Sequence, residues 1–341
     1  MKRVLVTGAG GFIGHHLVSY LKKKRYWVRG ADLKRPEYAP SVADDFALLD
    51  LRRSEDCLKA TDGIDEVYAL AADMGGVGFI SAHHAEIFRN NSLIDIHTLD
   101  AARQNGAKRY LYASSACVYP EYRQNDANVT SLKESDAYPA QPQDAYGWEK
   151  LVTERLCTHY REDFGLETRI VRFHNIFGPL GTWDGGREKA PAALCRKVSL
   201  AKLSGNHEIE IWGDGEQTRS FCYIDDCVEG IHRLMRSDYN EPLNVGQDRL
   251  VTVNELADMI AAIAKIKITR KHVAGPQGVR GRNSDNTQLR KVLRWEPQIS
   301  LEEGLKHTYL WIDRQVRAAE RRGASESLEK LSGGGGRRAS V

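Results

Sequence analysis

Tyr146 and Lys150 stand four residues apart in a stretch that predicts a helix over residues 145–164. Residues i and i+4 of a helix share one face, so the phenol and the ammonium are expected to lie side by side. A neighbouring positive charge favours ionisation of a phenol, whose ordinary pKa is about 10. Tyr146 could therefore exchange a proton with a hydroxyl group of a bound molecule, and Ser115 could hold that hydroxyl. The same spacing also occurs on plain helix surfaces, so the prediction depends on the accompanying motifs.

Cys117 follows Ser115 by two residues and could act as a second proton-transfer group. A thiolate removes protons well when nearby positive charges stabilise it. Lys189 lies in a glycine-flanked loop and could deliver a proton from the opposite side. The alternatives are an ordinary buried thiol for Cys117 and a solvated surface side chain for Lys189.

The chain begins with a short apolar run over residues 2–7, a glycine-rich turn, and then apolar residues at helical spacing. Strand, glycine turn and helix in this order are typical of a dinucleotide-binding site. Gly8 permits the tight turn, Gly11 lets the backbone approach a pyrophosphate, and Gly14 lets the helix pack closely on the strand. The amino end of the helix would then face the phosphates. A glycine-rich turn without a ligand is the alternative.

Asp32 ends the second predicted strand, eighteen residues after Gly14. A carboxylate there can accept hydrogen bonds from an adenosine ribose and repels a 2′-phosphate, so NAD is favoured over NADP. Lys34 and Arg35 lie nearby and could weaken that preference.

Further strands and helices alternate through the first half of the chain, which predicts an α/β fold with a doubly wound parallel sheet. Ligands of such sheets bind beyond the carboxyl ends of the strands. The strands are expected at 45–50, 65–72, 108–114 and 168–173, and the side chains at their ends that could line a cofactor site are Asp50, Leu51, Ala71, Ala72 and Ser114.

The domain organisation follows from where this alternation stops. Residues 1–175 are expected to form a Rossmann domain that binds NAD and is completed by about 221–246. Glycine- and proline-rich loops predict a smaller substrate-binding region in 176–220 and 247–312. Residues 313–341 end in a run of glycines and arginines and are expected to be a disordered tail.

The composition is that of a soluble enzyme. The chain has 341 residues and a net charge of +3, from 49 basic and 46 acidic side chains, which gives no indication of a nucleic-acid or membrane partner. No signal segment or membrane-spanning run is apparent. The six cysteines form no C-x-x-C pair, so neither a disulfide framework nor a metal site is expected, and a cytoplasmic location is the default.

Together these motifs resemble the extended short-chain dehydrogenase/reductase family, whose members act on nucleotide sugars. The resemblance runs from Val4 to about Trp311. Five loop segments are similar to those of family members that convert GDP-D-mannose to GDP-L-galactose: 73–80, 114–121, 173–175, 185–191 and 280–286.

The resemblance implies a bound NAD, a GDP-mannose substrate, a homodimer, and catalysis by Cys117, Lys189, Tyr146, Lys150 and Ser115. Cations suited to the substrate phosphates are Lys197, Arg219 and Arg282. The expected cofactor-binding residues are Gly8, Gly11, Phe12, Ile13, Gly14, Asp32, Asp50, Leu51, Ala71, Ala72, Ser114, Tyr146, Lys150 and Phe173. The expected substrate-binding residues are Gly75, Ser115, Asn175, Glu188, Lys189, Lys197, Arg219 and Arg282.

Inversion at C3 and C5 requires that C4 first become a ketone, because a sugar C–H is otherwise far too weakly acidic. Hydride returned to C4 would then close the cycle without consuming NAD. Two other functions stay open: a GDP-4-keto-6-deoxymannose epimerase/reductase that consumes NADPH, and an NAD-binding sensor or scaffold without turnover. Asp32 and residues 186–191 argue against the first. A 4,6-dehydratase is disfavoured because Ala116 and Cys117 replace its acidic pair.

Overall fold

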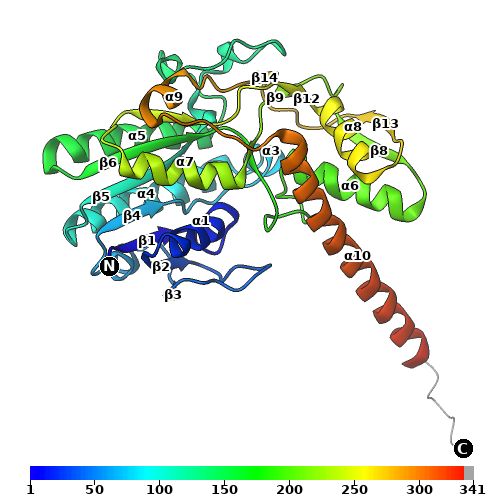
Figure 1. The fold of residues 1–341 in the computed structure, drawn as a ribbon, viewed down its shortest axis with the longest axis horizontal. Helices are drawn as coiled ribbons and strands as arrows, with labels where there is room; N and C mark the ends of the chain where they lie inside the picture. The colour runs from blue at the N-terminus through cyan, green and yellow to red at the C-terminus, as the bar shows by residue number, and fades with distance from the viewer. Residues whose placement is uncertain (334–341) are drawn as a thin grey trace, which may run out of the picture.

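The central element is a seven-stranded parallel sheet, seen in a computed structural model that describes residues 1–333, with side chains through Arg322 (Figure 1). Every strand pairs in parallel with its neighbours, so the predicted doubly wound sheet is confirmed. In spatial order the strands are β3 (Asp45–Leu48), β2 (Trp27–Asp32), β1 (Arg3–Thr7), β4 (Glu66–Ala69), β5 (Arg109–Ser115), β6 (Glu167–Phe173) and β11 (Pro242–Val245).

Helices cover both faces of this sheet. One layer contains α1 (Phe12–Lys23) and α7 (Ile224–Arg236), which contact each other; the other contains α2 (Ser54–Thr61), α4 (His84–Gln104) and α5 (Ala145–Phe164). Both α7 and β11 come from the later segment that was expected to complete the first domain.

Local signals set the ends of α5 where the sequence predicted them. The Asp144 carboxylate accepts a hydrogen bond from the Gly147 amide at 2.8 Å, which caps the amino end. Gly165 ends the helix with a φ of 71°, a conformation that glycine adopts at little cost. The helix therefore begins directly before Tyr146.

Helix α4 holds two buried asparagines. It starts at His84, and Asn90 and Asn91 both lie buried within it. The Asn91 side chain accepts a hydrogen bond from the Asp73 amide at 2.6 Å and donates one to Glu149 at 2.8 Å. Its polar groups thus join neighbouring segments instead of capping a helix.

Most of the remaining elements form a second region beside the sheet (Figure 1). Helix α6 (Ala190–Ser204) packs against α8 (Val253–Ala264) and α10 (Leu301–Gly333). The short strands of this region pair as β8 (Glu208–Trp212) with β13 (Thr269–Val273), β9 (Thr218–Arg219) with β12 (Val251–Thr252) and β14 (Gly281–Arg282), and β7 (Ile176–Phe177) with β10 (Cys222–Tyr223). Two short helices, α3 (Val77–Ile80) and α9 (Thr287–Leu293), complete the described secondary structure together with three 3₁₀ turns.

Helix α10 changes the expectation for the carboxyl end of the chain. Disorder was expected from residue 313, but the helix continues through Gly333 and Val316 is only 2% exposed. Asp313 accepts a hydrogen bond from Ser199 of α6 at 2.7 Å. Contacts with α6 therefore hold this part of α10 in place, and they could not be predicted from the composition of the chain's last residues. Residues 334–341 lie outside the described part of the chain.

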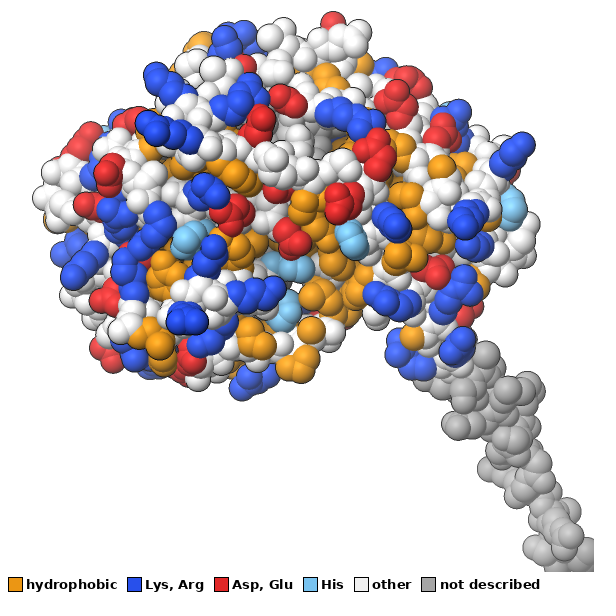
Figure 2. Space-filling view, viewed as in Figure 1, with side chains coloured by type: hydrophobic (Ala, Val, Ile, Leu, Met, Phe, Trp, Pro, Cys, Tyr) orange, Lys and Arg blue, Asp and Glu red, His pale blue; other side chains and the backbone are white. Residues whose placement is uncertain are grey.

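The surface in Figure 2 has lysine and arginine side chains interspersed with aspartate and glutamate, in keeping with the nearly balanced charge. Within the described residues, no helix has the length and apolar character needed to cross a membrane.

Candidate active site

A cavity of about 580 Å³ opens at the carboxyl ends of the sheet strands. All the residues expected to bind the cofactor line it, except Lys150, which is buried behind it. The rule that parallel sheets bind ligands at this edge accounts for the agreement. The cavity is large enough for a ligand much bigger than a sugar, and it extends to Gly75, Tyr146 and Lys189 on the substrate side.

The glycine-rich turn leaves its backbone open to this cavity. A β-carbon at Gly14 would lie 2.1 Å from the Gly8 carbonyl oxygen, so only glycine allows the helix to pack on the turn. Gly8 itself has a φ of 68°, which favours glycine. Gly11 precedes α1 without a side-chain cap, so the amides at the helix start are available to an anion such as a pyrophosphate.

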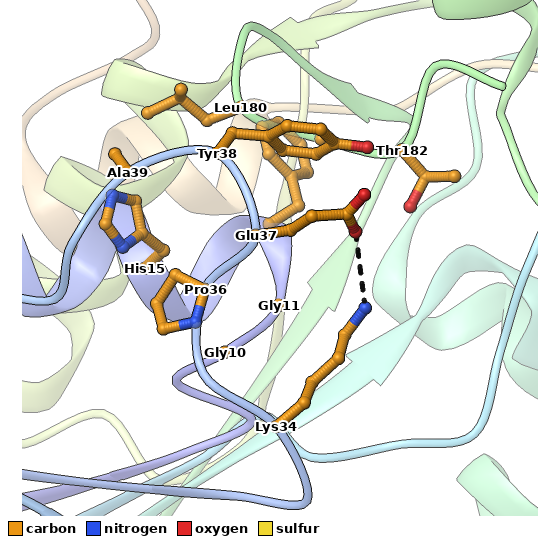
Figure 3. A pocket seen from close by; sticks show the side chains of 12 residues that line it. Gly10, Gly11, His15, Lys34, Pro36, Glu37, Tyr38, Ala39, Leu180 and Thr182 are labelled. Atoms are coloured by element: carbon orange, nitrogen blue, oxygen red, sulfur yellow. Dashed lines mark ion pairs between the residues drawn. The ribbon is translucent and has the colours of Figure 1, made fainter. Parts of the chain in front are cut away.

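Asp32 holds the turn and the following loop together. Its carboxylate accepts hydrogen bonds from the amides of Gly10 at 2.9 Å and Lys34 at 3.1 Å, and it lines the cavity. Lys34 pairs with Glu37 at 3.6 Å at the mouth of a smaller adjoining cavity of about 40 Å³ (Figure 3). Lys34, one of the two cations that could weaken the preference for NAD, therefore has a carboxylate partner of its own.

Tyr146 and Lys150 lie together as the spacing predicted. The Lys150 ammonium is 5.6 Å from the centre of the Tyr146 ring, and both side chains are buried. Burial raises the pKa of the Tyr146 phenol, whereas the positive charge of Lys150 acts to lower it. From the sequence, only the charge of Lys150 was expected to act on this pKa. Burial is the larger of the two effects.

Cys117 lies beside this pair and contacts an arginine. It packs in the apolar cluster that contains Tyr146, and its sulfur accepts a hydrogen bond from the Arg282 guanidinium at 3.3 Å. Ser115 caps the turn that carries Cys117, because its hydroxyl accepts from the Cys117 amide at 3.2 Å. A guanidinium at the sulfur is the kind of positive charge that a thiolate base needs.

Arg282 is oriented by Gln124, a residue that the sequence did not indicate. The Gln124 side chain is fully buried, accepts from the Arg282 Nε at 2.6 Å, and donates to the carbonyl groups of Tyr119 and Pro120. Gln124 and Arg282 are 158 residues apart in the chain, so no local pattern relates them.

A second guanidinium lies next to the first. Arg219 and Arg282 are direct partners in the pairing of β9 with β14, and Arg219 donates to backbone carbonyl groups, among them Val279 at 2.6 Å. Burial and the neighbouring Arg282 lower the pKa of Arg219, although an arginine keeps its charge at neutral pH. Within the described residues neither guanidinium forms an ion pair with a carboxylate, so this pair is a candidate anion site.

Lys189 reaches the same cavity from the loop before α6. Its side chain is accessible from the cavity but has many protein atoms around it. The resulting desolvation lowers the pKa of the Lys189 ammonium. A negative charge on Cys117 would act to raise that pKa. A lysine with a lowered pKa exchanges protons more readily near neutral pH.

Two glycines that the sequence did not single out bring these groups together. A β-carbon at Gly147 would lie 2.2 Å from the Cys117 carbonyl oxygen, so glycine allows α5 to approach the turn that carries the thiol. A β-carbon at Gly76 would lie 2.6 Å from the Glu188 carbonyl oxygen, and the Gly76 amide donates to the Arg187 carbonyl at 3.1 Å. This contact joins the 75–76 turn to the loop that carries Lys189.

Six predicted substrate contacts do not line the cavity in the described structure, and neither does the predicted catalytic residue Cys117; the six are Ser115, Asn175, Glu188, Lys197, Arg219 and Arg282. Three of these side chains bond to other parts of the protein. Asn175 donates to the Ser220 carbonyl at 2.8 Å, Glu188 pairs with Arg196 at 2.9 Å, and Lys197 donates to the Glu210 carbonyl at 2.6 Å. Each side chain is thus engaged in joining loops of the smaller region.

The chain is similar to known proteins in sequence and in fold. The sequence profile of the family described as "NAD dependent epimerase/dehydratase family" matches residues 4–246. A protein of Arabidopsis thaliana named GDP-mannose 3,5-epimerase is 52% identical over 328 residues, which cover 96% of this chain and 86% of that protein.

Two solved structures share the fold. The UDP-glucose 4-epimerase of Thermotoga maritima, with UDP-glucose, has a TM-score of 0.83 and 26% identity, and covers 92% of this chain and 100% of that one. The UDP-glucuronic acid 4-epimerase of Bacillus cereus, in complex with UDP-glucuronic acid and NAD, has a TM-score of 0.76 and 26% identity at the same coverages.

Proposed function

Because the chain belongs to the NAD dependent epimerase/dehydratase family, we propose that it epimerises GDP-mannose at C3 and C5, giving GDP-L-galactose. The observation that carries this proposal is the placement of Cys117 and Arg282 beside the Tyr146 and Lys150 pair. A dehydrogenase needs only the tyrosine and the lysine. A thiol with a guanidinium at its sulfur adds a group that can remove a proton from carbon.

The cavity fits NAD. Gly11 and the uncapped start of α1 would hold the pyrophosphate, and Asp32 would hold the adenosine ribose. When bound, NAD supplies reversible hydride exchange at C4 of the sugar. Tyr146 takes the proton of the C4 hydroxyl, Lys150 stabilises the resulting charge, and Ser115 orients the hydroxyl.

The C4 ketone makes the hydrogens at C3 and C5 acidic. The Cys117 thiolate removes the proton from one of these carbons, the electron pair of the C–H bond moves into an enolate, and the Lys189 ammonium donates a proton to the opposite face. Arg282 balances the charge at the sulfur. Arg219 lies beside Arg282, and in the part of the chain that the structure describes its hydrogen bonds go only to carbonyl groups, so it is suited to an anionic group of the substrate.

Turnover without net redox change tests this function. Purified protein given GDP-mannose should form the 3,5-epimer, with no lasting change in reduced-nicotinamide absorbance, because the hydride removed from C4 returns to it. Product analysis of the nucleotide sugar together with absorbance at equilibrium measures both. Stoichiometric consumption of NADPH with a 4-keto-6-deoxy sugar, and no reaction of GDP-mannose, would instead identify an epimerase/reductase.

The exposed sides of α4 and α5 support a homodimer. These helices pack side by side, and they present Phe88, Ile96, Trp148 and Val152 to solvent at 38, 46, 41 and 57% exposure. Apolar side chains gathered on two adjacent helices are typical of a surface that a second copy covers.

A charge in this surface should separate the copies. The Val152→Glu variant is expected to sediment as a monomer at micromolar concentration, whereas the parent sediments as a dimer, because the carboxylate would be buried in the interface. Leu203→Glu, at an exposed site on α6, is the control and should stay dimeric. A monomeric parent at this concentration would contradict the dimer.

A further inference from the structure

Lys150 has two carboxylate neighbours, and all three groups are buried. The Lys150 Nζ lies 3.5 Å from the Asp95 Oδ2 and 3.6 Å from the Glu149 Oε1, and no side chain of the three is more than 3% exposed. Asp95 comes from α4 and Glu149 from α5, directly before Lys150. The catalytic scheme above gives neither carboxylate a role.

The polar groups that face these carboxylates come from three elements. Asp95 accepts hydrogen bonds from the Tyr112 hydroxyl of β5 at 2.9 Å and from Thr153 of α5 at 3.3 Å. Glu149 accepts one from Asn91 of α4 at 2.8 Å through Oε1, while its Oε2 is buried without a hydrogen-bond partner. Tyr146 faces Lys150 from the same helix, and Lys150 is the sole cation that pairs with either carboxylate among the described residues.

Charge balance constrains this cluster. Two ionised carboxylates and one ammonium would leave a net negative charge among side chains that are at most 3% exposed, which is strongly unfavourable. One proton shared by the carboxylates removes the excess charge. Burial raises the pKa of both Asp95 and Glu149. Burial acts to lower the pKa of Lys150, but the two neighbouring carboxylates raise it by more.

We propose that Asp95 and Glu149 share one proton and together supply the single negative charge that keeps Lys150 protonated beside Tyr146. The inference deepens the proposed function, on which its kinetic part rests. Asp95 and Glu149 are positioning residues, because they act on the substrate only through Lys150 and Tyr146. Since one negative charge is enough, either carboxylate can replace the other.

Infrared spectroscopy tests the shared proton without any substrate. Difference spectra of the purified protein at neutral pH, parent minus Asp95→Asn and parent minus Glu149→Gln, should each show the loss of one protonated carboxylic acid. In each variant the remaining carboxylate is the sole counter-ion of Lys150 and gives up the proton. Asp100→Asn, at a part-exposed site on the same helix as Asp95, is the control and should leave this region of the spectrum unchanged. Spectra of the two variants that match the parent would overturn the proposal.

The rate of C4 oxidation tests whether Asp95 and Glu149 can replace each other as the counter-ion of Lys150. Each single variant should oxidise GDP-mannose within about threefold of the parent rate, with an unchanged pH profile. In the double variant Lys150 has neither carboxylate beside it, so burial favours the neutral amine. The pH–rate profile has one limb that reports ionisation of Tyr146, and this limb should move upward by about one to three pH units. The neutral-pH rate should then fall by about 10- to 1000-fold.

Folding and cofactor retention of the double variant are checked by thermal unfolding and by bound nicotinamide. A double variant no slower than the product of the two single effects would overturn the proposal. If the parent itself fails to turn over GDP-mannose, the proposed function fails, and the infrared result still decides whether the proton is shared.

Discussion

Cys117→Ser is expected to abolish epimerisation while leaving oxidation at C4 intact. The serine hydroxyl has nearly the size of the thiol but does not ionise near neutral pH, so no base remains at this position. Formation of the epimers should fall by about 10²- to 10⁴-fold, the usual contribution of a positioned proton-transfer group. Product analysis measures the loss. Transient absorbance of reduced nicotinamide in rapid mixing should be retained, because Tyr146, Lys150 and Ser115 are unchanged.

The control for this variant is Cys57→Ser. Cys57 is buried and does not line the cavity. Its sulfur contacts the Leu51 carbonyl at 3.1 Å and the Thr98 hydroxyl at 3.5 Å, contacts that a serine hydroxyl can also make. Lys189→Ala should likewise lose epimerisation and keep oxidation at C4, since it removes the group that protonates the opposite face of the sugar. A Cys117→Ser protein that forms epimers at the parent rate would mean that another group is the base.

Tyr146→Phe is expected to stop the reaction one step earlier. Phenylalanine keeps the buried ring but removes the hydroxyl that takes the C4 proton, so oxidation at C4 should fall by about 10²-fold or more. Both the transient nicotinamide signal and the epimers should be lost, whereas NAD should stay bound because the glycine turn and Asp32 are intact. Rapid-mixing absorbance and quantification of bound NAD measure these effects.

Tyr122→Phe removes a hydroxyl from an exposed tyrosine and serves as its control. Near-normal turnover of Tyr146→Phe would show that Tyr146 is a packing residue only.

The sequence was sufficient for the parallel sheet and for the side chains that lie at its carboxyl edge. Parallel strands that are buried on both faces have short apolar sequences, so they can be located in the chain. Their carboxyl ends meet at one edge of the sheet, and Asp50, Ala71 and Ser114 could therefore be placed near one another from the sequence. The ends of α5 were also predictable, since Asp144 and Gly165 are local signals.

The groups that support the catalytic side chains could not be predicted in this way. Gln124 meets Arg282 across 158 residues, and Asp95 meets Lys150 through the packing of α4 against α5, so only the tertiary structure brings them into contact. Glu149 was adjacent to Lys150 in the sequence, but neighbouring residues on a helix usually point to different sides, and nothing indicated a shared buried site.

The pKa of Tyr146 also depends on tertiary structure that the sequence does not show. Its neighbour Lys150 was visible in the sequence and suggested a lowered pKa, but the effect of burial depends on everything packed around the ring. Likewise α10 extends past residue 313 because Ser199 and other groups of the smaller region contact it.

Solvent deuterium incorporation shows whether Cys117 removes the protons at C3 and C5. The parent protein incubated with GDP-mannose in heavy water should place deuterium at C3 and C5 of the recovered sugar, because protons removed by Cys117 exchange with solvent or are replaced through Lys189. No deuterium should enter at C4, where the hydrogen leaves and returns as hydride, and Cys117→Ser should incorporate none at C3 or C5. Magnetic resonance of the recovered nucleotide sugar locates the label. Deuterium at C5 of the serine variant at the parent rate, or epimers from the parent without any label, would contradict this account.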